Sequence, residues 1–288
     1  MKTSLTHLPA DKQEELRSIT DTIVELIQPA MIILFGSYSR GNWVEDRYRD
    51  EKGTLHEYRS DYDILVVTEH HQDMPSGLAK QIRRRVKKAE NFQTTPHIIF
   101  HDIQFLNKEL GDGHYFFTDI VKEGTMLHDT GKYTLATPRE LSPKDRAYKA
   151  KLYYDQWFKT ANDFYQMAEF GMKEKNYNVA IFVLHQAAER YYVSVLLVFT
   201  DYKPKTHDLN ELNREAGYVD PRFKMIFPNQ TDEEKRLFTL LVKAYIDSRY
   251  KLGYTVAVED LQWLADRVQK LKELTEKICL ERIVGLGR

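Results

Sequence analysis

The chain has 288 residues, a formal net charge of −1 and 30% charged residues. It is long enough for two domains that each bury a core, and its balanced charge excludes a general polyanion binder, so any contact with nucleic acid must come from a local patch. The single cysteine, Cys279, excludes an internal disulfide framework and fits a reducing compartment, which leads us to expect a cytoplasmic protein.

Helices and strands alternate in the first half of the chain. The N-terminal residues lack the apolar core of a signal peptide, and no apolar run is long enough to span a bilayer, so we expect no membrane contact. The spacing of apolar residues predicts, in chain order, helix 11–28, strand 31–35, strand 63–67, helix 77–89, strand 97–100, and short helices at 106–110 and 116–122. This alternation predicts a small α/β domain with a mixed sheet, which we place at residues 1–130.

The first predicted strand is followed directly by Gly36 and Ser37. A Gly-Ser turn after a strand offers backbone N–H groups to a phosphate, particularly where a helix starts there. Arg40 follows closely, and its fixed fork of donors could offset phosphate charge. The sequence therefore predicts a phosphate-binding turn at this position.

Two aspartates, Asp61 and Asp63, lie at the start of the next apolar run. Alternate residues of a strand face the same side, so both carboxylates should enter one space. Carboxylates held together repel unless a cation or a proton separates them, and Mg²⁺ bound by carboxylates and substrate phosphates is the usual resolution. An Asp-x-Asp sequence at a strand end is also common as a turn or a cap. Beside the Gly-Ser turn, the pair predicts a site for Mg²⁺ and a nucleoside triphosphate.

These motifs resemble the signature of the minimal nucleotidyltransferases of the DNA polymerase beta superfamily, over about residues 15–130. The stretches that carry the resemblance are 34–37, 40–41 and 60–66. The resemblance implies that Gly36 and Ser37 bind nucleotide phosphates and that Asp61 and Asp63 hold two Mg²⁺ ions. It also implies transfer of a nucleoside monophosphate from ATP or another nucleoside triphosphate to an acceptor hydroxyl of a small molecule, an RNA or a protein.

Two departures from that signature affect the predicted activity. The insert at 42–59 is long and charged, and we interpret it as a solvated loop. The position of the family's third carboxylate corresponds to His97, which could accept a proton but adds no negative charge for a catalytic metal. The alternatives are a transferase in which His97 is catalytic and a nucleotide-binding module without turnover. An ordinary surface or core role is the competing interpretation of His97.

Strand patterns vanish in the second half of the chain. Residues 131–144 contain two prolines and little periodicity, which predicts a linker. Apolar spacing then predicts helices at 145–173, 176–199, 208–216, 232–250 and 258–283. Their antiparallel packing would give an all-α bundle at residues 145–288, and the whole chain an α+β two-domain architecture.

The second half resembles the HEPN family of helical-bundle domains over about residues 145–280. The stretches that carry this resemblance are 178–190, 205–209 and 245–250. The family implies dimerisation through the bundle, so we expect a homodimer. It also often accompanies a minimal nucleotidyltransferase as a genetic partner, and here both halves would lie in one chain.

Many HEPN domains are ribonucleases that use an arginine and, after about four intervening residues, a histidine on the same helix. Here Arg249 is followed at that position by Tyr254, a poor general base at neutral pH because its phenol has a pKa of about 10. A ribonuclease of toxin–antitoxin type is therefore the weaker alternative to a domain that binds nucleotides or anions. The candidate contacts for such a ligand are Lys203, Lys205, His207, Arg249, Tyr250 and Lys251. A helix cap at Thr206 or Asp208 is the competing interpretation of that stretch.

Overall fold

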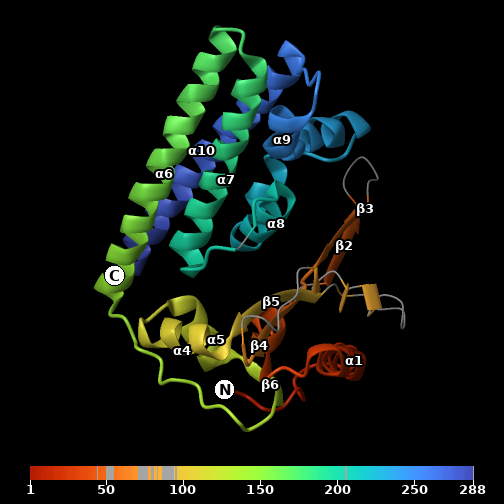
Figure 1. Cartoon of the computed structure of the whole chain (residues 1–288). Helices are drawn as coiled ribbons and strands as arrows, with labels where there is room; N and C mark the ends of the chain where they lie inside the picture. Colours follow the sequence, from red (N-terminus) through yellow and green to blue (C-terminus); the bar gives the residue numbers. More distant parts are fainter. Residues whose placement is uncertain are drawn as a thin grey trace. The chain divides into compact units, whose positions relative to one another are not determined.

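The structure, a computed structural model, describes residues 1–43, 45–49, 55–70, 77–78, 81–82, 84–85, 94, 96–204 and 206–287. The chain divides into two compact units, Met1–Glu140 and Leu141–Arg288. The first combines helices with a mixed sheet, and the described part of the second is helical (Figure 1). The predicted α+β architecture is confirmed.

The first unit is built on a sheet with the strand order β5-β4-β1-β6. Its strands are β1 (Met31–Phe35), β4 (Tyr62–Thr68), β5 (Pro96–Asp102) and β6 (Thr125–Asp129). Strand β1 runs antiparallel to β4 and β6, whereas β4 runs parallel to β5, which makes the sheet mixed as predicted. The two central strands are almost entirely buried, which explains why they appear in the sequence as continuous apolar runs rather than alternating ones.

Helices cover both faces of this sheet. Helix α1 (Ala10–Ile27) contributes its buried apolar side chains to a core shared with alternate residues of β1 and β4. Helices α4 (Ile103–Gly111) and α5 (Tyr115–Glu123) supply aromatic rings elsewhere in the unit, for example Phe116, whose ring lies edge-on to Phe35 at 5.7 Å. The sheet is therefore fixed from two sides, which holds the ends of its strands in place.

The insert before β4 contains regular structure that the sequence did not predict. Strands β2 (Glu45–Arg49) and β3 (Leu55–Arg59) form a two-stranded antiparallel sheet. We expected a charged loop because the insert has too few apolar residues to show the period of a strand. The predicted helix at 77–89 lies largely outside the described residues, although Leu78 and its described neighbours up to residue 85 are helical.

The second unit is a bundle around one central helix. Its elements are α6 (Pro143–Lys173), α7 (Tyr177–Thr200), α8 (Leu209–Val219), the 3₁₀ helix η2 (Pro221–Met225), α9 (Asp232–Tyr250) and α10 (Val258–Leu286). Helices α6, α8, α9 and α10 all pack against α7, and α6, α7 and α10 run side by side in Figure 1. Helix α7 is consequently buried on nearly all sides.

Helix ends in this unit follow the signals in the sequence. The Ser142 side chain accepts a hydrogen bond from the Asp145 backbone and precedes a proline in the first helical position. Thr231 and Glu234 form the expected capping box at the start of α9. No helix among the described residues is long and apolar enough to cross a membrane.

Candidate functional sites

The Gly-Ser turn lies directly against one of the predicted metal ligands. Gly36 follows β1 with a φ of +72°, in the left-handed region that favours glycine. A Cβ atom on Gly36 would lie 2.1 Å from Oδ2 of Asp63, so the contact can form only because this residue has no side chain. Phe35 is the register partner of Asp63 across the β1–β4 pair, which explains the close approach.

His97 completes this cluster from the neighbouring strand. Because β4 and β5 run parallel, the register places His97 beside Asp63, and Nδ1 of His97 lies 3.0 Å from Oδ1 of Asp63. An ionised carboxylate can only accept, so Nδ1 is the donor. The two side chains are 13% and 24% exposed. The structure thus brings Gly36, Asp63 and His97 together.

Asp61 lies two residues before Asp63, with Tyr62 between them. Tyr62 is fully buried in the core under α1, and its hydroxyl donates to Oε2 of Glu15 at 2.7 Å. Burial and this carboxylate raise the pKa of Tyr62 well above its usual range, so the phenol stays protonated. Strand alternation places Asp63 on the face opposite to Tyr62, whereas Asp61 lies just before the first residue of β4. That both carboxylates enter one space stays a prediction.

The remaining residues of this predicted site lie on the short helix α2 (Gly36–Arg40). Ser37 is in its first turn and accepts hydrogen bonds from the backbone N–H groups of Gly41 and Asn42 through its carbonyl. Arg40 ends the helix, and its Nη1 lies 3.5 Å from Oε2 of Glu123. Both side chains of this pair are about half exposed, and such pairs are weak enough for a phosphate to compete.

The donor set of this site suits Mg²⁺ but does not form a closed metal cage. Among the described residues, no three or more His, Cys, Asp or Glu side chains form a group that could hold a metal ion. Carboxylate oxygens are the ligands that Mg²⁺ prefers, and this ion commonly keeps waters and takes further oxygens from substrate phosphates. Carboxylates such as those of Asp61 and Asp63 are the donors that an open site of this type uses, and the binding of Mg²⁺ here stays a prediction.

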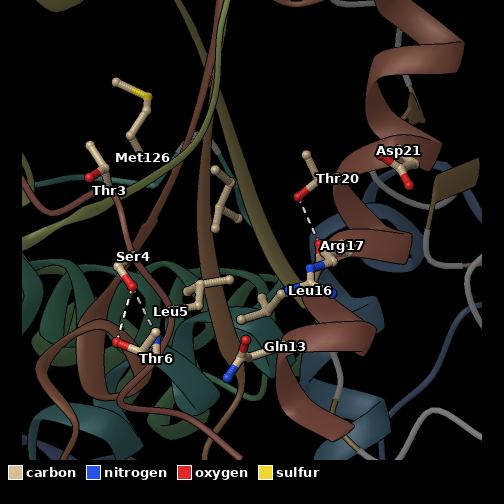
Figure 2. A pocket seen from close by; sticks show the side chains of 11 residues that line it. Thr3, Ser4, Leu5, Thr6, Gln13, Leu16, Arg17, Thr20, Asp21 and Met126 are labelled. Carbon is tan, nitrogen blue, oxygen red and sulfur yellow. Dashed lines mark hydrogen bonds between the residues drawn. The ribbon is translucent and has the colours of Figure 1, made fainter. Parts of the chain in front are cut away.

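A pocket of about 390 Å³ lies elsewhere in the same unit (Figure 2). It is lined by Thr3, Ser4, Leu5, Thr6, Gln13, Leu16, Arg17, Thr20, Asp21, Met126 and Leu127, which include none of the predicted site residues. Several of its polar groups bond to each other or to the backbone, as Figure 2 shows for the Ser4 and Thr6 hydroxyls, 3.0 Å apart. The pocket is therefore separate from the predicted nucleotide site.

The second cluster of polar residues lies in the helical unit. Nδ1 of His207, just before α8, lies 3.1 Å from both carboxylate oxygens of Glu189 on α7. The Glu189 side chain is 5% exposed and that of His207 is 58% exposed. The neighbouring Asp208 is the N-cap of α8, as the competing interpretation expected, and accepts from the backbone of Asn210. Lys205 lies outside the described residues.

Tyr245 on α9 connects His207 with the other predicted contacts. The His207 ring stacks on the Tyr245 ring with centroids 5.3 Å apart and an interplanar angle of 8°. The guanidinium carbon of Arg249 lies 4.3 Å from the same ring and 5.0 Å from the ring of Tyr250. His207 and Arg249 therefore both pack on the Tyr245 ring, and Tyr250 lies on Arg249.

The two other cationic candidates lie at different positions. Nζ of Lys203 lies 5.3 Å from the ring of Trp157, on α6. Lys251 is exposed and is the C-cap residue of α9. A role in ligand binding stays a prediction for both.

Glu189, His185 and Tyr245 were not assigned to a site from the sequence. His185 lies one helical turn before Glu189, is fully buried, and donates from Nδ1 to the Leu241 carbonyl at 3.0 Å. Burial lowers the pKa of His185, which favours the neutral ring. Its Nε2 has no hydrogen-bond partner in the described part of the chain and lies 3.9 Å from Oε2 of Glu189. Two ionisable residues four apart in the most apolar helix were the signal that could have revealed them.

A comparison with known protein families finds a match within the helical unit. Residues 154–279 match the HEPN domain. The helical unit therefore contains a HEPN domain, as the resemblance predicted, and the match does not extend to the α/β unit. The chain matches no curated protein.

Within the HEPN domain, Tyr254 occupies the position where the ribonuclease motif has a histidine. Its ring is 8% exposed and belongs to the core, and its hydroxyl has no hydrogen-bond partner among the described residues. Burial raises the pKa of Tyr254 to about 12. A buried phenol of that pKa does not act as a base at neutral pH, so this position does not supply the ribonuclease base.

Proposed function

We propose that the α/β unit is a Mg²⁺-dependent nucleotidyltransferase that transfers a nucleoside monophosphate from a nucleoside triphosphate to an acceptor hydroxyl. The main support is the contact between Gly36 and the Asp63 carboxylate. It supports a role for Asp63 as a metal ligand beside the predicted phosphate-binding turn, because a metal ion shared between a carboxylate and a phosphate needs the two groups close together.

Each residue has a role in this proposal. Asp61 and Asp63 hold Mg²⁺, which stabilises the charge that develops on the phosphates, and the N–H groups at Gly36 and Ser37 orient the triphosphate. The acceptor oxygen bonds to the α-phosphorus, the bond from that phosphorus to the bridging oxygen breaks, and pyrophosphate leaves. His97, held by Asp63, is the group near the metal ligands that can take the acceptor's proton.

The HEPN domain has a complementary role in this proposal. It forms a homodimer and binds a nucleotide through His207, Arg249 and Tyr250. A guanidinium packed on two tyrosine rings suits a ligand that carries both a phosphate and a planar base. The acceptor hydroxyl belongs to a small molecule, an RNA or a protein.

A nucleotide-binding module without turnover is the second candidate. It is favoured by His97, which lies where a third carboxylate is expected and leaves the metal site with two acids. Such a module would bind nucleoside triphosphates with Mg²⁺ but release no pyrophosphate.

The decisive experiment measures pyrophosphate release with labelled ATP, GTP, CTP or UTP, Mg²⁺ and candidate acceptors. Asp61→Asn and Asp63→Asn should each lower the rate on the order of 100-fold or more, because each removes a charged metal ligand. Asp21→Asn, at an exposed position of α1, is the matched control and should leave the rate unchanged. Binding without release would favour the binding module. RNA cleavage that survives both aspartate substitutions but requires Arg249 would favour a ribonuclease.

A further inference from the structure

Glu189 is not an ordinary charge on a helix surface. It lies inside α7, which is apolar along most of its length, and its side chain is 5% exposed. A carboxylate is retained in such a place only if donors compensate the loss of water. In the described part of the chain, the hydrogen bonds to this carboxylate come from His207 alone.

The contact with Glu189 determines which ring nitrogen of a neutral His207 carries the hydrogen. Because the carboxylate only accepts, the ring hydrogen of a neutral His207 lies on Nδ1, and Nε2 carries a free lone pair. Stacking on Tyr245 fixes the plane of the ring. The His207 side chain is 58% exposed, so the edge away from Glu189, which carries Nε2, is open to a ligand.

His185, the other histidine near Glu189, does not supply the hydrogen bond that this carboxylate needs. Its own hydrogen is on Nδ1, which donates to the Leu241 carbonyl. A neutral His185 therefore directs a second lone pair from Nε2 towards Glu189, at 3.9 Å, and supplies no hydrogen bond. The Glu189 carboxylate therefore needs Nδ1 of His207 as its hydrogen-bond donor.

We propose that Glu189 is a positioning residue which holds His207 as a hydrogen-bond acceptor for a ribose hydroxyl, and that the HEPN domain is thereby selective for ribonucleotides. Arg249, packed on the same tyrosine ring, meets the phosphate of that ligand, and Tyr250, 73% exposed, offers a ring for its base. This rests on the proposed binding of nucleotides by the HEPN domain. The hydroxyl concerned is the 2′-hydroxyl, so a 2′-deoxyribonucleotide cannot donate the hydrogen bond that Nε2 accepts.

The test uses the full chain with ¹⁵N-labelled histidine, and the His207 signals are assigned with a His207→Gln variant. In the wild type, at a pH where the ring is neutral, the hydrogen should be on Nδ1. In Glu189→Leu it should move to Nε2, whereas Glu189→Gln, which keeps an acceptor oxygen, should retain it on Nδ1. Glu169→Gln, an exposed change on α6, is the control.

Titrations followed at the His207 signals then measure binding at this site alone. The wild type should bind ATP about 2- to 10-fold more tightly than 2′-deoxyATP, the effect of one lost hydrogen bond, whereas 3′-deoxyATP, which keeps the 2′-hydroxyl, should bind as ATP does. Glu189→Leu should abolish that preference, and Glu189→Gln should keep most of it. If Glu189→Leu is unstable, the wild type alone still tests the inference, through the position of its ring hydrogen on Nδ1 and its preference for ATP over 2′-deoxyATP.

Two results would overturn the inference: an unchanged tautomer in Glu189→Leu, or a His207 signal that responds equally to ATP and 2′-deoxyATP or to neither of them. Pyrophosphate release is measured separately and does not involve His207. Failure of the transferase proposal and failure of ribose selection are therefore distinguishable.

Discussion

Both the backbone conformation at position 36 and the close contact with Asp63 require a glycine there. Alanine at this position would be strained by the φ of +72° and would also collide with Asp63 at 2.1 Å. A strained backbone of this kind costs about 1–3 kcal/mol, and the collision adds to it. We expect Gly36→Ala to lower the free energy of unfolding and to abolish nucleotide-dependent activity, measured by urea denaturation and pyrophosphate release.

Gly131 provides the matched control for that substitution. It has a φ of +69°, but a Cβ atom added there would meet no atom within 4 Å, so Gly131→Ala carries the backbone strain without the collision. The difference between the two variants isolates the contact with Asp63. Equal losses of stability and of activity in both variants would contradict the role given to this contact.

The buried His185 predicts a dependence of stability on pH. Its pKa is lowered in the folded state by burial, whereas in the unfolded chain it is about 6.5. The unfolded state therefore binds more protons as the pH falls, and stability decreases below about pH 6.5. The groups that face His185 are Glu189, His207 and Asp208, and the carboxylates partly offset the effect.

His185→Gln tests this dependence, because glutamine can still donate to the Leu241 carbonyl but does not titrate. Urea unfolding at pH 7 and pH 5 should show a smaller loss of stability in the variant than in the wild type. His128→Gln, at a partly exposed position in β6, should leave the dependence unchanged. A variant as sensitive to acid as the wild type would show that other groups cause the loss.

Cys279 illustrates how burial controls reactivity. The thiol is fully buried, and burial raises its pKa to about 12. Only the thiolate is a good nucleophile, so we expect native protein at pH 8 to react with a thiol reagent far more slowly than protein in urea. Rapid labelling of the native chain, followed by absorbance, would contradict this burial.

Residues that belong to a motif could be proposed as a site from the sequence, whereas residues outside any motif could not. The Gly36–Asp63 approach follows a local signature on two adjacent strands. The bond between Glu189 and His207 joins a helix to the loop before the next one, and no local period reveals it. His207 was identifiable from the sequence, whereas its partner looked like an ordinary helix charge.

At the scale of elements, helix ends were predictable because their signals are local. Helix α9 spans Asp232–Tyr250, as predicted, since Thr231 and Glu234 form a capping box at its start. The hairpin of β2 and β3 and the short helix η2 were missed. Neither contains enough apolar residues to show the spacing typical of a strand or a helix. Their formation depends instead on contacts with residues distant in the sequence.

The capping box gives a prediction at this scale. Thr231→Ala removes the hydroxyl that accepts from the Glu234 backbone, and the free energy of unfolding should fall by about 1 kcal/mol. Thr160→Ala, within α6, is the control: its hydroxyl bonds to the carbonyl of its own helix at Gln156, and its loss should change little. The measurement is urea unfolding followed by circular dichroism. Equal effects would argue against the cap.

At the scale of the whole molecule, the HEPN domain leads us to expect a homodimer. Light scattering during size-exclusion chromatography should give twice the 34.0 kDa mass of one chain at micromolar concentration. A mass of one chain over that range would count against dimerisation. The assay does not require nucleotide, so it tests the assembly independently of the proposed chemistry.

The central position of α7 has a consequence for how the HEPN domain recognises a ligand. Four helices pack around it, so its backbone amides should exchange with deuterium more slowly than those of any surrounding helix. Glu189 is rooted in this slowest segment, whereas most recognition surfaces are carried by loops. His207 itself lies in the loop before α8, but its bond to Glu189 anchors the ring to this helix, so the loss of affinity from ordering that ring should be small.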